Sequence, residues 1–239
     1  MHHDAVSHLE PAQDTRAADW LLAGLRGFGE SVLSIVPAGF ERYVRLFHPP
    51  YRRRNGQLVP VRWAEIAAVR GKRCHPGMQL HALTDSYQLG NPPPPDFDHW
   101  PHLGSLPLPE CRALATALTR WTSAETAWFA FWNGYGDTRD NELLMSSPTF
   151  KAPAREYFLL TGPPHAATGN LPDSGRFQSA NLWWPDDHTW CVASEIDLIT
   201  TYIGCSEQCC QALLDVPGLE TLEIDPATGI DFDSDFLNR

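Results

Sequence analysis

The sequence lacks the features that mark membrane-spanning and exported proteins. No stretch of its 239 residues approaches the roughly 18 consecutive apolar residues that a transmembrane helix needs. The first residues, Met1 to Asp4, contain neither the basic segment nor the apolar segment of a secretory signal peptide. We therefore expect a soluble, cytoplasmic protein that does not contact a membrane.

The signatures of the common enzyme classes are also missing. There is no G-x-S-x-G elbow, no H-E-x-x-H motif, no Walker loop and no CxxC pair. Gly27 and Gly29 have no third glycine in step, so a dinucleotide-binding turn is not supported. Hydrophobic residues make up 43% of the chain and charged residues 20%, which argues for an ordinary globular protein and against disorder. No reaction type follows from these patterns.

Lysine is scarce, and the basic residues are unevenly placed. Sixteen of the 18 cationic side chains are arginine, and five of the 18 lie after residue 120. Residues 42–73 carry nine basic side chains against Glu65, whereas residues 186–239 carry twelve acidic side chains against Arg239. The second segment thus accounts for the formal net charge of −11.

Two interpretations fit this asymmetry. The arginines could bind an anion, and Arg52, Arg53 and Arg54 are then the candidate anion-binding residues. Alternatively, the two charged segments face one another or are simply solvated. An acidic chain is a poor non-specific binder of polyanions, so we favour the second interpretation and do not expect a nucleic-acid partner.

The six cysteines are expected to be reduced thiols, because no secretory signal is present. His188 and Cys191, followed by the group Cys205, Cys209 and Cys210, contain zinc-ligand types, but their spacing matches none of the common zinc fingers. We expect small buried hydrophobic side chains at these positions, and we predict neither a metal nor a cofactor.

Proline divides the chain, because 7 of the 21 prolines fall within residues 90–109. We expect this segment to connect an N-terminal helical or mixed lobe, residues 1–89, to an acidic lobe, residues 110–239. Strand-like runs joined mainly by turns, with helices gathered at the ends, indicate an α+β fold. The sheet should be largely antiparallel, with flanking helices.

Local patterns predict individual elements. Phe40, Tyr43, Val44 and Phe47 recur at i, i+3, i+4 and i+7, which predicts an amphipathic helix over residues 37–47. Further helices are expected at 17–28, 63–69, from Pro109 onward, and at 206–214. Strands are expected at 32–36, around an Asn55-Gly56 hairpin turn, and at 126–132, 157–161, 190–201 and 219–224. The C-terminal acidic residues are expected to form a frayed tail.

Aromatic and polar residues at strand ends form the candidate site. The strand over residues 126–132 delivers Trp132, Asn133 and Tyr135 into a glycine-containing turn. Asp137, Asp140 and Glu142 follow, and their oxygens are ligands that Mg²⁺ or Ca²⁺ would accept, although such acidic turns are usually just solvated.

Two more pairs belong to this candidate site. Trp183 and Trp184 are adjacent, so either one indole is left for a ligand while the other packs inward, or both are buried. Alternation along residues 190–198 places Glu195 and Asp197 on one face, about 7 Å apart. That separation suits an acid/base pair with a water between them or a receptacle for arginines, and it is equally typical of a solvated sheet face.

Several of these segments resemble an uncharacterised family of actinobacterial proteins with no assigned activity. The similar stretches are residues 36–41 with His48-Pro49, and residues 128–136, 181–185, 190–197 and 201–204. The family pattern continues past Tyr202 with paired glycines, where this chain has Gly204-Cys205, so the resemblance does not extend to the cysteine group. A proline-led helix followed by aromatic strands also resembles SUKH-type immunity proteins, which neutralise toxins by binding.

Together these observations favour a non-catalytic, immunity-like binding protein that recognises a basic protein partner. Its recognition surface would consist of Trp132, Asn133, Tyr135, Trp183, Trp184, Glu195 and Asp197. One alternative is a hydrolase or transferase that uses Glu195 and Asp197 as acid/base groups, with Mg²⁺ near Asp137 and Asp140. A second alternative is polyanion binding through Arg52 to Arg54.

Overall fold

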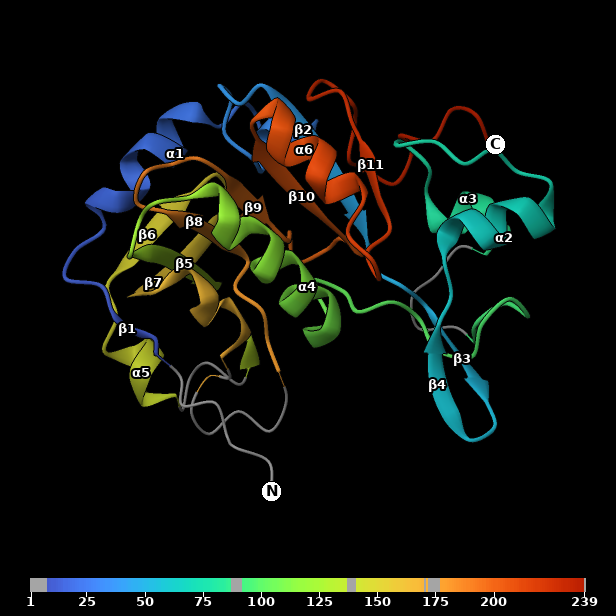
Figure 1. The fold of residues 1–239 in the computed structure, drawn as a ribbon, viewed down its shortest axis with the longest axis horizontal. Helices are drawn as coiled ribbons and strands as arrows, with labels where there is room; N and C mark the ends of the chain where they lie inside the picture. The colour runs from blue at the N-terminus through green and yellow to red at the C-terminus, as the bar shows by residue number, and fades with distance from the viewer. Residues whose placement is uncertain (1–7, 87–91, 137–140, 170, 172–176, 239) are drawn as a thin grey trace.

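Short apolar segments along most of the chain assemble into one large sheet (Figure 1). The computed structural model describes residues 8–86, 92–136, 141–169, 171 and 177–238. The strands of this sheet are β1 (Glu10–Pro11), β2 (Arg42–Phe47), β5 (Ala127–Trp132), β6 (Thr149–Ala152), β7 (Arg155–Gly162), β8 (Leu182–Pro185), β9 (Cys191–Ala193), β10 (Thr200–Cys205) and β11 (Thr221–Glu223). They follow the order β1-β7-β5-β8-β9-β10-β2-β11, with β6 paired to β7, and all these pairings are antiparallel.

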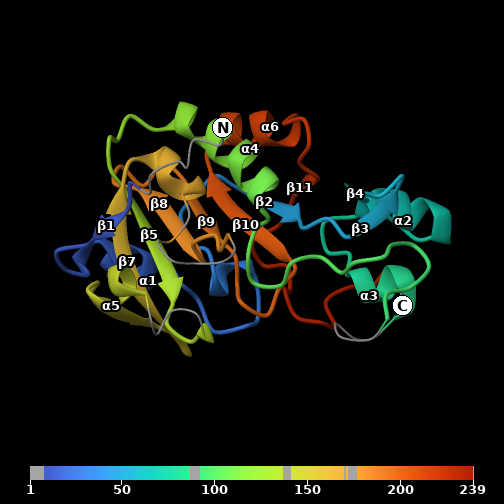
Figure 2. The same ribbon diagram turned by 90° about the horizontal axis from the view of Figure 1, so that it is seen from below.

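Apolar side chains cover both faces of the sheet. α4 (Leu108–Leu118) and α6 (Glu207–Leu214) pack on one face, where they share a cluster with Phe129 and Trp183 (Figure 2). α1 (Asp19–Gly24) packs on the opposite face, in a cluster with Ala130 and Trp184. Successive residues of β5 and β8 therefore alternate between two buried layers. A short helix, α5 (Glu142–Met145), precedes β6.

A side lobe projects from one end of the sheet (Figures 1 and 2). It contains the hairpin β3 (Tyr51–Arg54) and β4 (Gln57–Pro60), the helices α2 (Trp63–Arg70) and α3 (Leu80–Thr84), and the C-terminal segment 231–238. Asn55 and Gly56 turn the hairpin with φ angles of 50° and 81°, the left-handed pair that a tight two-residue turn requires. Trp63, Ile66 and Leu83 form the apolar centre of this lobe.

The expected fold class is confirmed, because the structure is α+β with a largely antiparallel sheet and flanking helices. The hairpin, α2, α4 and α6 lie where the local signals placed them. Ser206 is the N-cap of α6, and its Oγ accepts the Cys209 N–H at 3.3 Å. No helix in the described part of the chain combines the length and apolar character needed to cross a membrane.

The helix expected over residues 37–47 is wrong, because residues 42–47 form β2. β2 lies between β10 and β11 in the sheet, and apolar clusters cover both of its faces. Tyr43 joins one sheet cluster while Val44 and Leu46 join the other. Strands buried on both faces carry apolar residues at nearly every position. Just before and within β2, some apolar residues happen to recur at the i, i+3, i+4 and i+7 spacing of a helix, which misled the prediction. Strands from both sides of the proline-rich segment thus share one sheet.

Other element predictions also need correction. Residues 32–36 are not a strand, because residues 32–34 form a 3₁₀ turn in which the side chains of Ser31 and Ser34 cap each other's backbone. Residues 190–201 are not one strand but two, β9 and β10, joined by a turn. The C-terminal segment is not frayed, since Asp235 is buried and accepts the backbone N–H groups of Gln79, Leu237 and Asn238.

Arg45 joins the sheet to the side lobe. It lies in the middle of β2, opposite Tyr202 of β10, and is 1% exposed. Its Nη1 donates to the carbonyl oxygens of Pro76 and Met78 at 2.7 and 2.9 Å. Its guanidinium carbon lies 4.8 Å from the ring centre of Phe47 and 5.6 Å from that of Tyr202. Carbonyl dipoles and aromatic faces, rather than a carboxylate ion pair, hold this buried charge among the described residues.

Replacement of Arg45 should therefore destabilise the whole protein. Arg45→Met removes the donor for the carbonyl groups of Pro76 and Met78, and we expect a loss of about 2–5 kcal/mol in the free energy of unfolding. Urea unfolding followed by tryptophan fluorescence measures this loss. Arg53→Met, at an exposed hairpin position, is the control and should change stability by less than about 0.5 kcal/mol. A stability of Arg45→Met within the error of the control would contradict the assignment.

Candidate functional site

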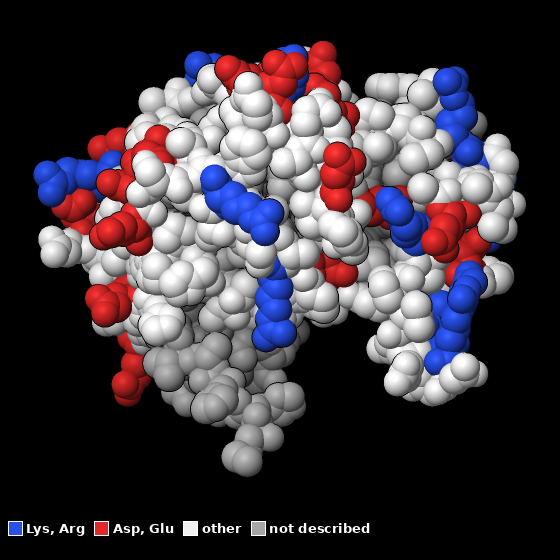
Figure 3. All heavy atoms as spheres, viewed as in Figure 1, with Lys and Arg blue, Asp and Glu red and all other residues white. Residues whose placement is uncertain are grey.

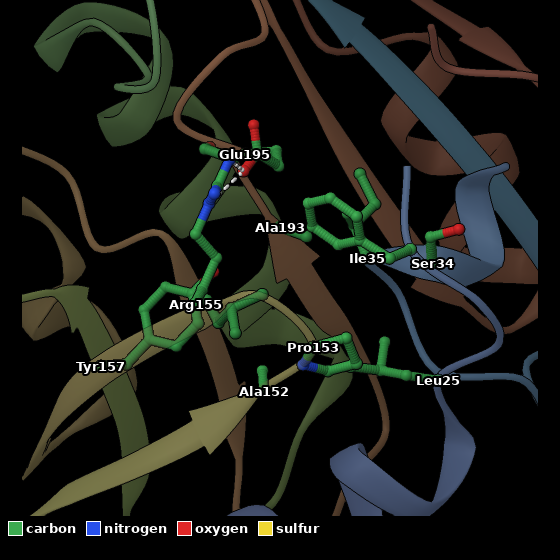
Figure 4. A pocket seen from close by; sticks show the side chains of 12 residues that line it. Leu25, Ser34, Ile35, Ala152, Pro153, Arg155, Tyr157, Ala193 and Glu195 are labelled. Atoms are coloured by element: carbon green, nitrogen blue, oxygen red, sulfur yellow. Dashed lines mark hydrogen bonds and ion pairs between the residues drawn. The ribbon is translucent and has the colours of Figure 1, made fainter. Parts of the chain in front are cut away.

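Glu195 and Asp197 lie in the turn after β9, where both bind Arg155 of the same chain, and Figure 4 shows the contact with Glu195. Arg155 opens β7, directly after the turn from β6. Its Nε donates to Glu195 Oε1 at 2.9 Å, and its Nη2 donates to Asp197 Oδ2 at 2.7 Å. The Asp197 N–H donates to Glu195 Oε2 at 2.6 Å and holds the turn closed. Of the roles expected for this pair, the structure shows the arginine receptacle.

A small cavity adjoins this ion pair (Figure 4). Its volume is about 30 Å³, and Phe28, Ile35 and Tyr157 contribute to its mainly apolar wall. A buried water needs roughly 10–15 Å³, so this space has room for one or two waters and is far smaller than the sites that hold drug-sized ligands. Burial, and then the charge of Glu195, raises the pKa of Tyr157, which is therefore a neutral phenol rather than a base.

Trp132, Asn133 and Tyr135 surround the same ion pair. The Trp132 ring centre lies 6.0 Å from the guanidinium carbon of Arg155, and the Tyr135 ring meets Trp132 edge-on at 5.0 Å. Tyr135 Oη donates to the Gly104 carbonyl at 2.9 Å, and Asn133 Nδ2 donates to Glu156 Oε2 at 2.7 Å. The structure thus brings most of the expected residues together, but internal contacts occupy Asn133 Nδ2 and Tyr135 Oη.

The idea that one of the adjacent indoles is left for a ligand is wrong. Trp183 is 1% exposed and Trp184 is fully buried. Because both residues belong to β8, they point to opposite faces of the sheet and enter its two apolar clusters. The adjacent indoles are therefore core residues on both sides, as the alternative interpretation of the sequence allowed.

Arg52, Arg53 and Arg54 occupy β3 in the side lobe, at whose outer edge basic side chains are visible (Figure 3). Arg52 Nη2 donates to the carbonyl oxygen of Asp96, and the Arg53 N–H donates to Asp98 Oδ2 at 2.6 Å. These contacts attach the hairpin to the proline-rich segment, residues 90–109.

The two charged segments meet in part. Arg42 lies 3.0 Å from Glu207 and 3.2 Å from Glu223, both of which belong to the acidic segment. Arg70 and Lys72 pair outside that segment, at 2.5 Å with Asp96 and at 3.2 Å with Asp85. Among the described residues, the ion pairs between residues 42–73 and residues 186–239 therefore involve Arg42.

The possible metal ligands fall into two groups. Asp137 and Asp140 lie outside the described residues. Within the described ranges, no three His, Cys, Asp or Glu side chains are placed to hold one metal ion. Cys205, Cys209 and Cys210 are buried, as expected, and burial raises the pKa of Cys210 to about 11. A thiol with such a pKa stays protonated at neutral pH.

An open groove that the sequence analysis missed lies on the α1 side of the sheet. Its volume is about 660 Å³, and we call it the indole groove. It is lined by Gln13, Asp14, Arg16, Ala17, Asp19, Trp20, Trp128, Thr161, Asp186 and His188. The residues come from stretches that are far apart in the chain, which is why no sequence motif marked them.

Aromatic contacts fix the shape of the indole groove. His188 stacks on Trp20 with ring centres 4.1 Å apart, and Trp20 in turn meets the buried Trp184 edge-on at 6.3 Å. Trp128 is the cross-strand neighbour of Trp184, and its Nε1 donates to Asp186 Oδ1 at 3.1 Å. The buried Trp184 therefore supports two indoles that are partly exposed in the groove.

The indole groove is negatively charged. Among its described lining residues, Asp14, Asp19 and Asp186 stand against the cation Arg16, whose Nη2 lies 2.6 Å from Asp14. Burial lowers the pKa of His188 despite the nearby aspartates, so this imidazole is neutral at pH 7. An excess of carboxylate next to aromatic faces is the environment in which proteins hold guanidinium and ammonium groups.

A series of buried hydrogen bonds links side chains of the sheet around His48. His48 is fully buried, and its Nδ1–H donates to the His102 carbonyl at 2.7 Å. Its Nε2 therefore accepts the hydroxyl of Thr201 at 2.8 Å, and Thr201 Oγ1 lies 2.7 Å from Ser194 Oγ. Burial lowers the pKa of His48 to about 4, which keeps the imidazole neutral in the folded protein.

Comparisons with protein-family models, with curated proteins and with solved structures find no match to this chain.

The buried His48 should make stability depend on pH. In the unfolded chain its pKa is near 6.5, so between pH 6.5 and 4 the unfolded state binds a proton that the folded state does not. Stability should therefore be fully present above pH 6.5 and should fall by about 3 kcal/mol as pH drops to 4. Urea unfolding of the wild type and of His48→Gln at several pH values tests this. The variant should be less stable at pH 7 and lose less stability on acidification, and equal slopes would contradict the assignment.

Proposed function

We propose that the protein is a non-catalytic binding protein that recognises a basic protein partner through the indole groove. The observation that carries the proposal is the lining of this groove, in which partly exposed indoles and three aspartates face one open space of about 660 Å³. The proposal keeps the partner class favoured by the sequence and moves its binding surface away from Trp183 and Trp184, which are buried.

The groove suits an arginine side chain of the partner. A guanidinium can donate to Asp19 and Asp186 while its flat face lies on an aromatic ring, since both contacts are compatible with its planar geometry. A cation–π contact contributes about 0.5–2 kcal/mol, and an exposed ion pair contributes up to about 1 kcal/mol. One arginine would therefore bind weakly, and useful affinity requires several basic residues on the partner.

The charge of the whole molecule supports the same partner class. The formal net charge is −11, and acidic side chains gather at the end of the molecule away from the side lobe on the face drawn in Figure 3. The negative electrostatic field of these side chains speeds association with a basic partner and slows association with an acidic one. Affinity should consequently fall as salt rises.

The indole groove can be tested with an arginine-rich peptide. Asp19→Asn/Asp186→Asn removes two carboxylates, and the amide oxygen introduced by Asp186→Asn can still accept the hydrogen bond from Trp128. We expect a tetra-arginine peptide to bind the wild type saturably at low salt and to bind this double variant about tenfold more weakly. Titration calorimetry and quenching of tryptophan fluorescence measure the affinity.

The control is Asp215→Asn/Asp225→Asn, which removes two exposed charges that do not line the groove. If both double variants weaken binding equally, the attraction comes from net charge alone and the groove assignment fails. Absence of saturable binding to the wild type at low salt would also reject the proposal. If the proposal holds, pull-downs from a lysate should retain a basic protein on the wild type and on the control variant, and the groove variant should lose it.

A further inference from the structure

A second cavity, of about 350 Å³, lies where the side lobe meets the body of the protein. Its lining comes from the end of β2, from the start of α2, from the first turn of α4 and from the loop before β11. The residues are Phe47, Pro49, Pro60, Val61, Arg62, Glu65, Glu110, Gly218, Leu219 and Glu220. This volume falls in the range of small-molecule sites. We call it the Glu110 cavity, and it shares no residue with the indole groove.

One carboxylate oxygen of Glu110 is buried without a donor. The residue lies in the first turn of α4 and is 6% exposed. Its Oε2 has no hydrogen-bond partner among the described residues. Burial raises the pKa of Glu110, as expected for a carboxyl that has lost water without gaining donors. A buried polar atom of this kind costs free energy unless a donor reaches it.

The other carboxylates of the cavity differ from Glu110. Glu220 accepts the N–H groups of Trp63 and Ala64 at 2.7 and 2.8 Å, so both its oxygens cap the N-terminus of α2. Arg62 and Glu65 also line the cavity, and both are exposed. The described lining thus has three carboxylates against one guanidinium, and the buried oxygen that lacks a donor there belongs to Glu110.

The remaining wall favours an apolar ligand body. Phe47, Val61 and Leu219 are buried hydrophobic residues. Pro49 and Pro60 add apolar surface and have no backbone N–H to offer. A ligand here meets apolar surface on most sides and an acceptor, rather than a donor, at its polar end.

We propose that the Glu110 cavity binds a small aliphatic amine in its ammonium form, with the Glu110 carboxylate as its ion-pair partner. The ammonium lies beside the Glu110 side chain, which lines the cavity, and the hydrocarbon part packs against the apolar wall. An anion is disfavoured, because it would have to enter beside three carboxylates. A neutral alcohol of the same shape would leave the excess negative charge of the lining uncompensated.

Cyclohexylamine and cyclohexanol are matched probes, since they differ in an ammonium against a hydroxyl. We expect titration calorimetry at pH 7 to show saturable binding of cyclohexylamine, at least about tenfold tighter than cyclohexanol. Glu110→Gln keeps the shape and removes the charge, so it should weaken cyclohexylamine at least about tenfold. Arg62→Gln removes the cation of the lining, so it should strengthen the binding of cyclohexylamine about two- to fivefold.

Glu142→Gln is the control, because Glu142 is an exposed glutamate that does not line the cavity and should leave binding unchanged. Equal affinity for amine and alcohol, or an undiminished affinity of Glu110→Gln, would overturn the proposal. If Glu110→Gln does not fold, the opposite shift in affinity expected of Arg62→Gln still tests the proposal.

The groove variant Asp19→Asn/Asp186→Asn should bind cyclohexylamine like the wild type, and Glu110→Gln should bind the arginine peptide like the wild type. Failure at one site is thereby distinguished from failure at the other.

Discussion

The buried guanidinium of Arg45 is the constraint on which the arrangement of the two parts of the molecule depends. Removing an arginine from water costs several kcal/mol, and it cannot lose its proton to avoid that cost. The segment before α3 must therefore present the carbonyls of Pro76 and Met78 to it. Gln79, next along this segment, binds Asp235 and Ser234 in the C-terminal segment. A single charge in β2 thus fixes a loop of the side lobe, and that loop fixes the end of the chain.

The fate of Arg45 also shows why charge counts along the sequence describe the surface poorly. The basic segment seemed to form one positive pole, yet its members have different roles. Arg45 is enclosed in the core, Arg42 pairs with the acidic segment and Arg70 pairs with Asp96. The acidic residues are compensated just as unevenly, and the described lining of the indole groove keeps more carboxylates than cations. The electrostatic field near each site follows from these local balances rather than from segment totals.

Local chemistry made part of the fold predictable. The Asn55-Gly56 turn, the Ser206 cap and Pro109 in the first turn of α4 act over a few residues, so the sequence displays them directly. β2 could not be recognised in this way, because its pairing depends on β10 and β11, which come far later in the chain. The C-terminal segment was misread for the same reason, since Asp235 finds its partners near residue 79.

The candidate sites were harder to predict because a carboxylate acquires its role from donors that are distant in sequence. Glu195 and Asp197 looked like a chemical pair, but Arg155, 40 residues before Glu195, occupies both. Glu220 receives the first two N–H groups of α2 from a helix that lies far earlier in the chain. Glu110 carries no sequence feature that distinguishes it from these carboxylates, and in the fold it keeps an oxygen with no donor among the described residues. Ligand chemistry in an acidic protein is therefore to be sought where the fold leaves a carboxylate uncompensated, and not where carboxylates are adjacent in sequence.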